Sequence, residues 1–344
     1  MKYYFIGTDE AGYGPNLGPL SVSASLWSAD FPKCDDPLSS LNRRGEACLQ
    51  RKEVFRICDS KKLYHSGRIL PLERSFFYAY EKSILQQDEL PLFRGAISPE
   101  PPRCTDWKAV IKTLSVAHSA EKKFRPPWEK ESVFPLPLTE TEYWEDEFCR
   151  DYEESERCFQ EAGITLLRIA NRRVQPQEFN QAVDRIGLKS ELLASVTMEV
   201  ALSLIRPLIA ECGNDRVEFF LCCDKLGGRN RYGDLLTCFF PEMMFQIETE
   251  SRPLSRYSFP LRRGGFTVLF QAKGESNLPS AMASIVSKYT REISMKAFNE
   301  YWQKRVPDLE PTAGYPVDAK RFLEETQSER ERLGIDNDLF WRKK

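Results

Sequence analysis

Three apolar, strand-like runs of this sequence end on acidic residues, and this feature restricts the fold more than any other. A run that is apolar throughout is typical of a central strand buried on both faces of a sheet. Functional side chains gather beyond strand ends in such sheets, so the acids are expected to meet. The runs are KYYFIGTD (2–9), ending on Asp9 and followed by Glu10, RVEFFLCCD (216–224), ending on Asp224, and GGFTVLFQAKGE (264–275), ending on Glu275.

Further strand-like and helical segments alternate with these runs. Such alternation indicates an α/β or mixed α+β architecture. The expected strands are 20–27, which forms a hairpin-like pair with 2–9, then 164–174 and 243–251; the expected helices are 64–86, 188–209 and 277–306, with Asn277 as the cap of the last.

The middle of the chain differs from the rest in composition and in hydrophobic periodicity. Prolines at 91, 99, 101, 102, 126, 127, 135 and 137 lie among scattered charges with little periodicity. This composition predicts an insertion or a small loop-rich subdomain. At 344 residues with 41% hydrophobic content, the chain is long enough for one large or two ordinary domains.

The overall composition excludes several classes of protein. Lys and Arg number 49 and Asp and Glu 51, so net charge neither requires nor excludes a nucleic-acid partner. Ten cysteines without a CxxC pair, together with two histidines, fit neither a disulfide scaffold nor a zinc site, which favours reduced thiols. No long apolar segment suggests export or membrane spanning, so a cytoplasmic protein that does not associate with a membrane is expected.

A cluster of four carboxylates would repel itself unless cations bound to it. Oxygen ligands without histidine favour Mg²⁺ or Mn²⁺, and two such ions about 4 Å apart can activate water and stabilise the leaving oxygen of a phosphodiester. Adjacent strand residues face opposite ways, so Asp9 and Glu10 share one site only if the strand breaks, for which Gly12 and Gly14 supply freedom. The alternative is that each acid is an ordinary turn residue.

The same residues lie in sequence blocks that resemble the type 2 ribonuclease H family. The blocks occur in the family's order, and the resemblance covers roughly residues 1–86 and 163–325. They are GTDEAGYGPNLGPL (7–20), CDSKKL (58–63), LCCDKLGG (221–228), KGESNLPSAMASIVSKYTRE (273–292) and GYPVDAKRFLEE (314–325).

The resemblance implies a ribonuclease H-like mixed sheet flanked by helices, formed by 1–86 and 163–325. The insertion would then be 87–162 and the C-terminal tail 326–344. It also implies a metal-dependent endonuclease that cuts RNA in RNA/DNA hybrids, or at ribonucleotides embedded in duplex DNA. The residues that match the family's metal carboxylates are Asp9, Glu10, Asp224 and Glu275.

The resemblance assigns a second group of residues to nucleic-acid binding. Those near the phosphate backbone would be Ser60, Lys61 and Lys62, and those facing the site from the long helix would be Ser284 and Lys288; those reading the ribose 2′-OH would be Gly12, Tyr13, Gly14 and Tyr315. Ordinary structural roles stay open as alternatives: Lys61 and Lys62 could be a solvated pair, and Tyr315 could be a core residue. Likewise, the basic cluster Lys225, Arg229 and Arg231 could touch phosphate or hold its loop.

Three departures from the family pattern point to a divergent member. Tyr13 stands where the family has an arginine, the fourth acid is Glu275 rather than aspartate, and the connection from Glu275 to the following helix is one residue shorter. Two other functions therefore stay open: a catalytically weak nucleic-acid-binding protein on the same fold, and a phosphoesterase with another substrate. The sequence leaves protein partners unknown.

Overall fold

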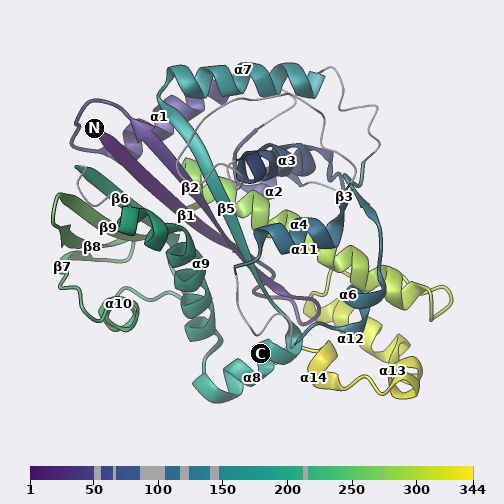
Figure 1. The fold of residues 1–344 in the computed structure, drawn as a ribbon. Helices are drawn as coiled ribbons and strands as arrows, with labels where there is room; N and C mark the ends of the chain where they lie inside the picture. The colour runs from purple at the N-terminus through teal and green to yellow at the C-terminus, as the bar shows by residue number, and fades with distance from the viewer. Residues whose placement is uncertain are drawn as a thin grey trace.

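The computed structural model of the chain describes residues 1–49, 56–64, 67–85, 105–116, 124–139, 147–211, 216–272 and 274–343. Its centre is a seven-stranded mixed sheet of order β5-β2-β1-β6-β9-β8-β7 (Figure 1). The inner strands β1, β6 and β9 are parallel, and the other pairs are antiparallel. The strand bounds are β1 Lys2–Ala11, β2 Leu20–Asp30, β5 Ile164–Val174, β6 Val217–Asp224, β7 Gln246–Glu250, β8 Leu254–Leu261 and β9 Gly264–Gln271.

Helices cover both faces of this sheet (Figure 1). Along β1 the side chains alternate between two cores, with Tyr3 and Phe5 on the face of α11 and α3, and Tyr4 and Ile6 on the face of α9. The helix bounds are α1 Pro37–Leu49, α2 Ser60–Leu63, α3 Leu70–Leu85, α8 Pro176–Ile186, α9 Lys189–Glu211, α10 Gly233–Phe239, α11 Leu278–Gln303, α12 Pro316–Glu325, α13 Gln327–Leu333 and α14 Asn337–Phe340.

Helix α11 approaches the sheet closely enough to require a glycine on β1. A Cβ atom on Gly7 would lie 2.1 Å from the backbone nitrogen of Ser280. Most of α11 is buried, including Met282, Ile285 and Tyr289. This close packing fixes α11 against the part of the sheet where the predicted acids lie.

The fold class predicted from the sequence is confirmed, Asn277 has the predicted cap position, and two details of the prediction were wrong. The strand that starts at Gly264 ends at Gln271, so Glu275 lies in a short 3-10 turn, Gly274–Ser276. A further strand, β8, occupies the stretch expected to be a turn. Asn277 takes the cap position of α11 without capping it through its side chain; the Leu278 amide donates to Asn42 Oδ1 instead, at 2.9 Å.

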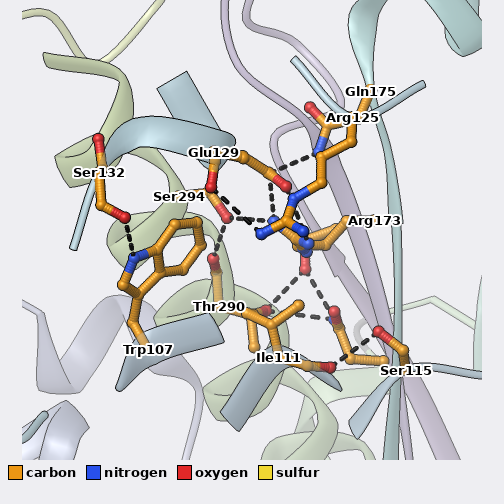
Figure 2. A network of polar contacts seen from close by, with 12 residues as sticks. Trp107, Ile111, Ser115, Arg125, Glu129, Ser132, Arg173, Gln175, Thr290 and Ser294 are labelled. Atoms are coloured by element: carbon orange, nitrogen blue, oxygen red, sulfur yellow. Dashed lines mark hydrogen bonds and ion pairs between the residues drawn. The ribbon is translucent and has the colours of Figure 1, made fainter. Parts of the chain in front are cut away.

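The described parts of the expected insertion pack against the main sheet and α11. Their elements are β3 Thr105–Asp106, α4 Trp107–Leu114, α6 Pro127–Glu131, β4 Pro135–Leu136 and α7 Glu147–Glu161. Figure 2 shows the main anchor, where Glu129 of α6 pairs with Arg173 of β5 beside Ser294 of α11. Trp128 joins a third core formed with the end of α11, α12 and α14. The domain boundaries themselves stay a prediction.

One helix of the described chain is long and apolar enough to cross a membrane. It is the stretch Lys189–Ile209 of α9. Its most apolar 18 residues have a mean hydropathy of 1.7, and 67% of these residues are buried inside the protein. Because α9 contributes Leu193, Val200 and Ile205 to the core under the sheet, packing in this core accounts for its apolar composition.

Candidate active site

Two of the predicted acids lie at the ends of neighbouring parallel strands. The β1–β6 pairing ends with Gly7 opposite Cys222, and extending this register by two residues brings Asp9 opposite Asp224. Neighbouring strands in a sheet lie about 5 Å apart. The convergence of these two carboxylates, which are far apart in the sequence, therefore follows from the strand order.

The charges of three acids act on one another at this point. Burial raises the pKa of Asp9 to about 8, with further increases from the negative charges of Glu10 and Asp224. A hydrogen bond from the Ser284 hydroxyl, which stabilises the ionised form, opposes these effects. Without a cation, Asp9 therefore binds its proton more tightly than an ordinary aspartate does.

The strand does not break between Asp9 and Glu10, contrary to the condition set by the sequence. Strand β1 continues to Ala11 and stays paired with β2, with Asp9 opposite Ser23 and Glu10 opposite Val22. Only the pairing with β6 stops early, at Gly7. The two side chains thus alternate across the sheet, with Asp9 on the side of α11, and they interact around the end of the β1–β6 pair.

The Asp224 carboxylate holds the backbone that leads to Glu275. Its Oδ1 accepts hydrogen bonds from the amides of Lys225, at 2.9 Å, and Gly274, at 3.3 Å. A Cβ atom on Gly274 would lie 3.2 Å from the Asp224 Cα, so the two backbones are in contact. The side chain of Glu275 lies outside the described part of the structure, and its role as a fourth ligand stays a prediction.

Within the side chains that the structure describes, no three His, Cys, Asp or Glu residues come together as a metal-binding group. Asp9 and Asp224 lie at the strand ends, and the charge of Glu10 also acts on Asp9. The potential metal ligands that these three acids offer are all oxygen atoms.

The DSKKL block lies directly behind Asp9. Ser60 Oγ is 2.9 Å from Ser284 Oγ, the hydroxyl that also bonds Asp9. Asp59 caps α2 by accepting from the amide of Lys61 at 3.0 Å. The block therefore reaches the acids through a chain of two serines, while both of its lysines, Lys61 and Lys62, stay exposed.

Lys288 lies one turn beyond Ser284 on α11. Its Nζ is 2.5 Å from Glu292 Oε1 and 4.3 Å from the centroid of the Tyr64 ring. Tyr64 in turn donates to Glu292 Oε2 at 3.1 Å. Lys288 is therefore half-buried and held by an ion pair next to the site, and its contact with nucleic acid stays a prediction.

The glycine loop that follows β1 has one glycine fixed by geometry and one open to solvent. Gly12 adopts a φ of 86°, and a Cβ there would lie 2.2 Å from Arg291 Nε. A Cβ on Gly14 would meet nothing within 4 Å. Between them, Tyr13 is half-buried and lies under Lys189, whose Nζ is 4.7 Å from the ring centroid. The first turn of α9 thus brings a cation to the position where the family's arginine is missing.

Tyr315 lies on the surface beside the same loop. The carbonyl of Gly314 accepts from the amides of Asn16, at 2.8 Å, and Leu17, at 3.3 Å, so the GYP block is joined to the loop. Tyr315 itself is 59% exposed, which rules out the core alternative.

The basic cluster after Asp224 holds its own loop. Lys225 Nζ donates to Ser255 Oγ at 2.6 Å and to the Ser251 carbonyl at 2.9 Å. Arg229 pairs with Glu191 at the start of α9. Arg231 alone of the three is strongly exposed, with a side chain 90% accessible.

Comparison with known proteins gives similarities in three dimensions alone. No family model and no curated protein matches the sequence. The chain is similar to RNase HII of Archaeoglobus fulgidus, solved in complex with PCNA, with 14% identity, a TM-score of 0.41 and coverage of 98% of this chain and 92% of that one. It is also similar to ribonuclease H2 of Pyrococcus horikoshii OT3, with 16% identity, a TM-score of 0.36 and coverage of 99% and 92%.

A third similar structure is Bst-RNase HIII in complex with Mn²⁺, with 13% identity, a TM-score of 0.40 and coverage of 99% of this chain and 66% of that one.

The sequence reasoning missed three cations around the loop: Lys189, Arg291 and Arg342. Arg291 lies inside a quoted block, at the helical spacing of Ser284 and Lys288, so its position on α11 offered a signal. Lys189 and Arg342 offered none, because only the tertiary structure brings them to residues 12–17.

Proposed function

We propose that this protein is a metal-dependent endonuclease that hydrolyses RNA phosphodiester bonds in RNA/DNA hybrids or at ribonucleotides embedded in DNA. The observation that carries the proposal is that Asp9 and Asp224 lie two residues beyond the last pair of the adjacent parallel strands β1 and β6, where the charges of Asp224 and Glu10 both act on Asp9. Crowded, partly buried carboxylates are unfavourable unless a cation compensates them. Such an arrangement is costly for stability and suits a metal centre.

The donor set fits Mg²⁺ or Mn²⁺, because hard oxygen ligands without histidine or thiolate favour these ions. Asp9 and Asp224 would hold the metal, Glu10 would reach it from the other face around the end of the β1–β6 pairing, and Glu275 is the proposed fourth ligand. When bound, the metal would supply an activated water and stabilise charge on the leaving oxygen. The chain's own contribution is orientation: Ser284 positions Asp9, and the Gly274 amide positions Asp224.

Nucleic acid is the substrate class that the surroundings of the acids support. Exposed Lys61 and Lys62 lie on one side of the acids and half-exposed Lys189 on the other, so both sides offer cations to phosphates. The open backbone at Gly14 and the exposed Tyr315 would read the ribose 2′-OH. The cytoplasmic location expected from composition remains part of this proposal.

A cleavage panel tests the proposal directly. All-DNA, all-RNA, hybrid and single-ribonucleotide duplexes are incubated with Mg²⁺, with Mn²⁺ and with EDTA, and Asp224→Asn is the control for contaminating nuclease. We expect metal-dependent cuts in the hybrid or at the single ribonucleotide. Tight hybrid binding without cuts would identify a binding protein instead, and hydrolysis of a simple phosphodiester alone would identify another phosphoesterase.

Substitutions of Glu275 distinguish a nuclease from a protein that binds nucleic acid without cleaving it. Glu275→Gln removes a charge at constant shape, so metal affinity and cleavage should fall together while duplex binding, carried by phosphate contacts, survives. Glu275→Asp then reports how far the backbone lies from the ions: activity collapses if Asp falls short and is retained if the backbone lies close. Activity indifferent to both changes would remove Glu275 from the ligand set.

A further inference from the structure

The segment that ends the described chain is built into the glycine loop. Figure 1 shows the C-terminus beside α8 and α14, below the end of β1. Arg342 is 1% exposed, and its Nη2 donates to the carbonyls of Gly12, at 2.5 Å, and Pro15. Its backbone amide donates to the Asn16 carbonyl at 2.8 Å, and Asn16 Nδ2 donates back to the Arg342 carbonyl at 3.0 Å.

A second arginine supports the loop from α11. Arg291 Nη2 donates to the carbonyls of Leu17, at 3.3 Å, and Ala313, at 3.0 Å, and its Nε lies against Gly12. The loop carbonyls of residues 12, 15 and 17 therefore all point towards two guanidinium groups beneath the loop.

These carbonyl directions decide where the loop amides point. In a trans peptide the C=O and the following N–H point in opposite directions. The Gly12 carbonyl faces Arg342, so the Tyr13 N–H points away from Arg342. Residues 12–14 are those proposed to read a ribose hydroxyl.

The two arginines are buried without a carboxylate partner, and the groups they do contact are the loop carbonyls and, for Arg342, the Phe179 ring, 5.0 Å from its Cζ. Neither forms an ion pair within the described residues, and Nε and Nη1 of Arg342 have no hydrogen-bond partner there. Burial lowers the pKa of Arg342, and so does the charge of neighbouring Arg291. The two adjacent cations repel each other, and what they gain in return is the set of hydrogen bonds to the carbonyls of Gly12, Pro15, Leu17 and Ala313.

We propose that Arg342 is a positioning residue for the glycine loop and that, with Arg291, it forms a cationic seat beneath residues 12–17. The seat holds the loop carbonyls inward, directs the Tyr13 N–H away from Arg342, and adds a positive field under the surface that meets the nucleic acid. The nucleic-acid part of this inference rests on the proposed function, whereas the loop-positioning part does not.

The central test compares Arg342→Gln and Arg342→Lys with a matched control, Arg330→Gln. Arg330 is also a buried arginine near the C-terminus; it donates to the Leu323 carbonyl at 3.0 Å and to Asn337 Oδ1 at 2.6 Å and packs on Phe340, and neither of these hydrogen bonds goes to the loop carbonyls. The readouts are amide hydrogen exchange of residues 12–17, the melting temperature, and the affinity for a 20-base-pair RNA/DNA hybrid and for the same duplex in DNA, both in EDTA.

We expect Arg342→Gln to speed exchange in residues 12–17 by about tenfold, equivalent to about 1.4 kcal/mol of lost local protection. It should also weaken hybrid binding more than DNA binding, while Arg342→Lys recovers part of the hybrid affinity because it keeps the charge. Arg330→Gln should lower the melting temperature without either effect. In the active protein, Arg342→Gln should raise KM more than it lowers kcat.

A second variant loosens the segment without altering the seat. Asn180 clamps it by donating to the Trp341 carbonyl at 2.8 Å and accepting from the Lys343 amide at 2.8 Å. Asn180→Ala should speed loop exchange in the same residues by a smaller factor. Unchanged loop exchange in both Arg342→Gln and Asn180→Ala would overturn the positioning role. Faster loop exchange in a protein that binds no hybrid would support positioning and overturn the nucleic-acid part.

Discussion

Two carboxylates that lie beside α11, the buried Glu129 and the half-buried Asp9, have surroundings that differ in kind. Glu129, 3% exposed, accepts two hydrogen bonds from Arg173 and one from Gln175 at 2.7 Å (Figure 2). Asp9 meets the charges of Glu10 and Asp224 and one hydroxyl, that of Ser284. The negative charge of Glu129 is compensated by Arg173. The negative charges around Asp9 repel one another, and a bound cation would reduce this repulsion.

The pairing of Glu129 with Arg173 is one of the contacts that attach the insertion, beside the buried ion pair of Glu156 with Lys82. Arg173 on β5 also donates to Ser294 Oγ of α11 at 3.2 Å, so one guanidinium joins α6, the sheet edge and the long helix. The other group, the three mutually repelling acids, lies at the ends of the inner strands instead, where backbone pairing stops. Mutations at the two groups should therefore separate stability from activity.

The largest effect is expected from Asp224→Asn. Losing a carboxylate that touches the proposed metal should cost more than the 10- to 100-fold loss typical of an outer-shell partner, and we expect about 1000-fold in kcat/KM on a hybrid substrate. The free energy of unfolding should stay equal or rise, because a repulsion is removed. If the activity of Asp224→Asn stays within tenfold of that of the unmodified protein, Asp224 is not a metal ligand and the proposed difference between the two groups of carboxylates is wrong.

Glu129→Gln should show the opposite pattern. It leaves the charge of Arg173 buried without compensation, so we expect the free energy of unfolding to fall by about 3 kcal/mol, measured by urea denaturation. Activity per folded molecule should not change. Glu131→Gln is the control in the same helix: its side chain is 53% exposed and pairs with Arg305, so its loss should cost less than about 1 kcal/mol.

The pH dependence of stability should sharpen the comparison further. The raised pKa of Asp9 means that the folded state keeps a proton which the unfolded chain releases near pH 4. In EDTA, stability should therefore fall as pH rises from about 4 to about 8. Asp9→Asn should flatten this fall, and Mg²⁺ should oppose it. A profile that Asp9→Asn leaves unchanged would contradict the crowding account.

The smallest effect is expected on binding. Replacing Lys61 and Lys62 together with Ala should weaken hybrid binding and reduce the slope of log Kobs against log salt by about 1.8, if each lysine neutralises one phosphate. Filter binding between 50 and 200 mM NaCl measures this slope. A slope that does not change would return both residues to an ordinary solvated pair.

The sequence by itself determined the elements and the acids at their ends, because alternating and continuous apolar runs reflect local burial. The strand predicted at 164–174 has the observed bounds, and Asp224 ends its strand as expected. The end of β9 was placed too late because pairing, rather than composition, stops it at Gln271, opposite Asp224.

Only the tertiary structure decided which acids meet and what supports them. Asp9 and Asp224 come together because β1 and β6 are adjacent and in register, a property of strand order that no local pattern encodes. Arg342 reaches Gly12 across 330 residues of sequence, and Lys189 reaches Tyr13 from another helix. Such contacts depend on how separate elements pack. The residues around Arg342 show no hydrophobic periodicity from which its burial or its contact with Gly12 could be predicted.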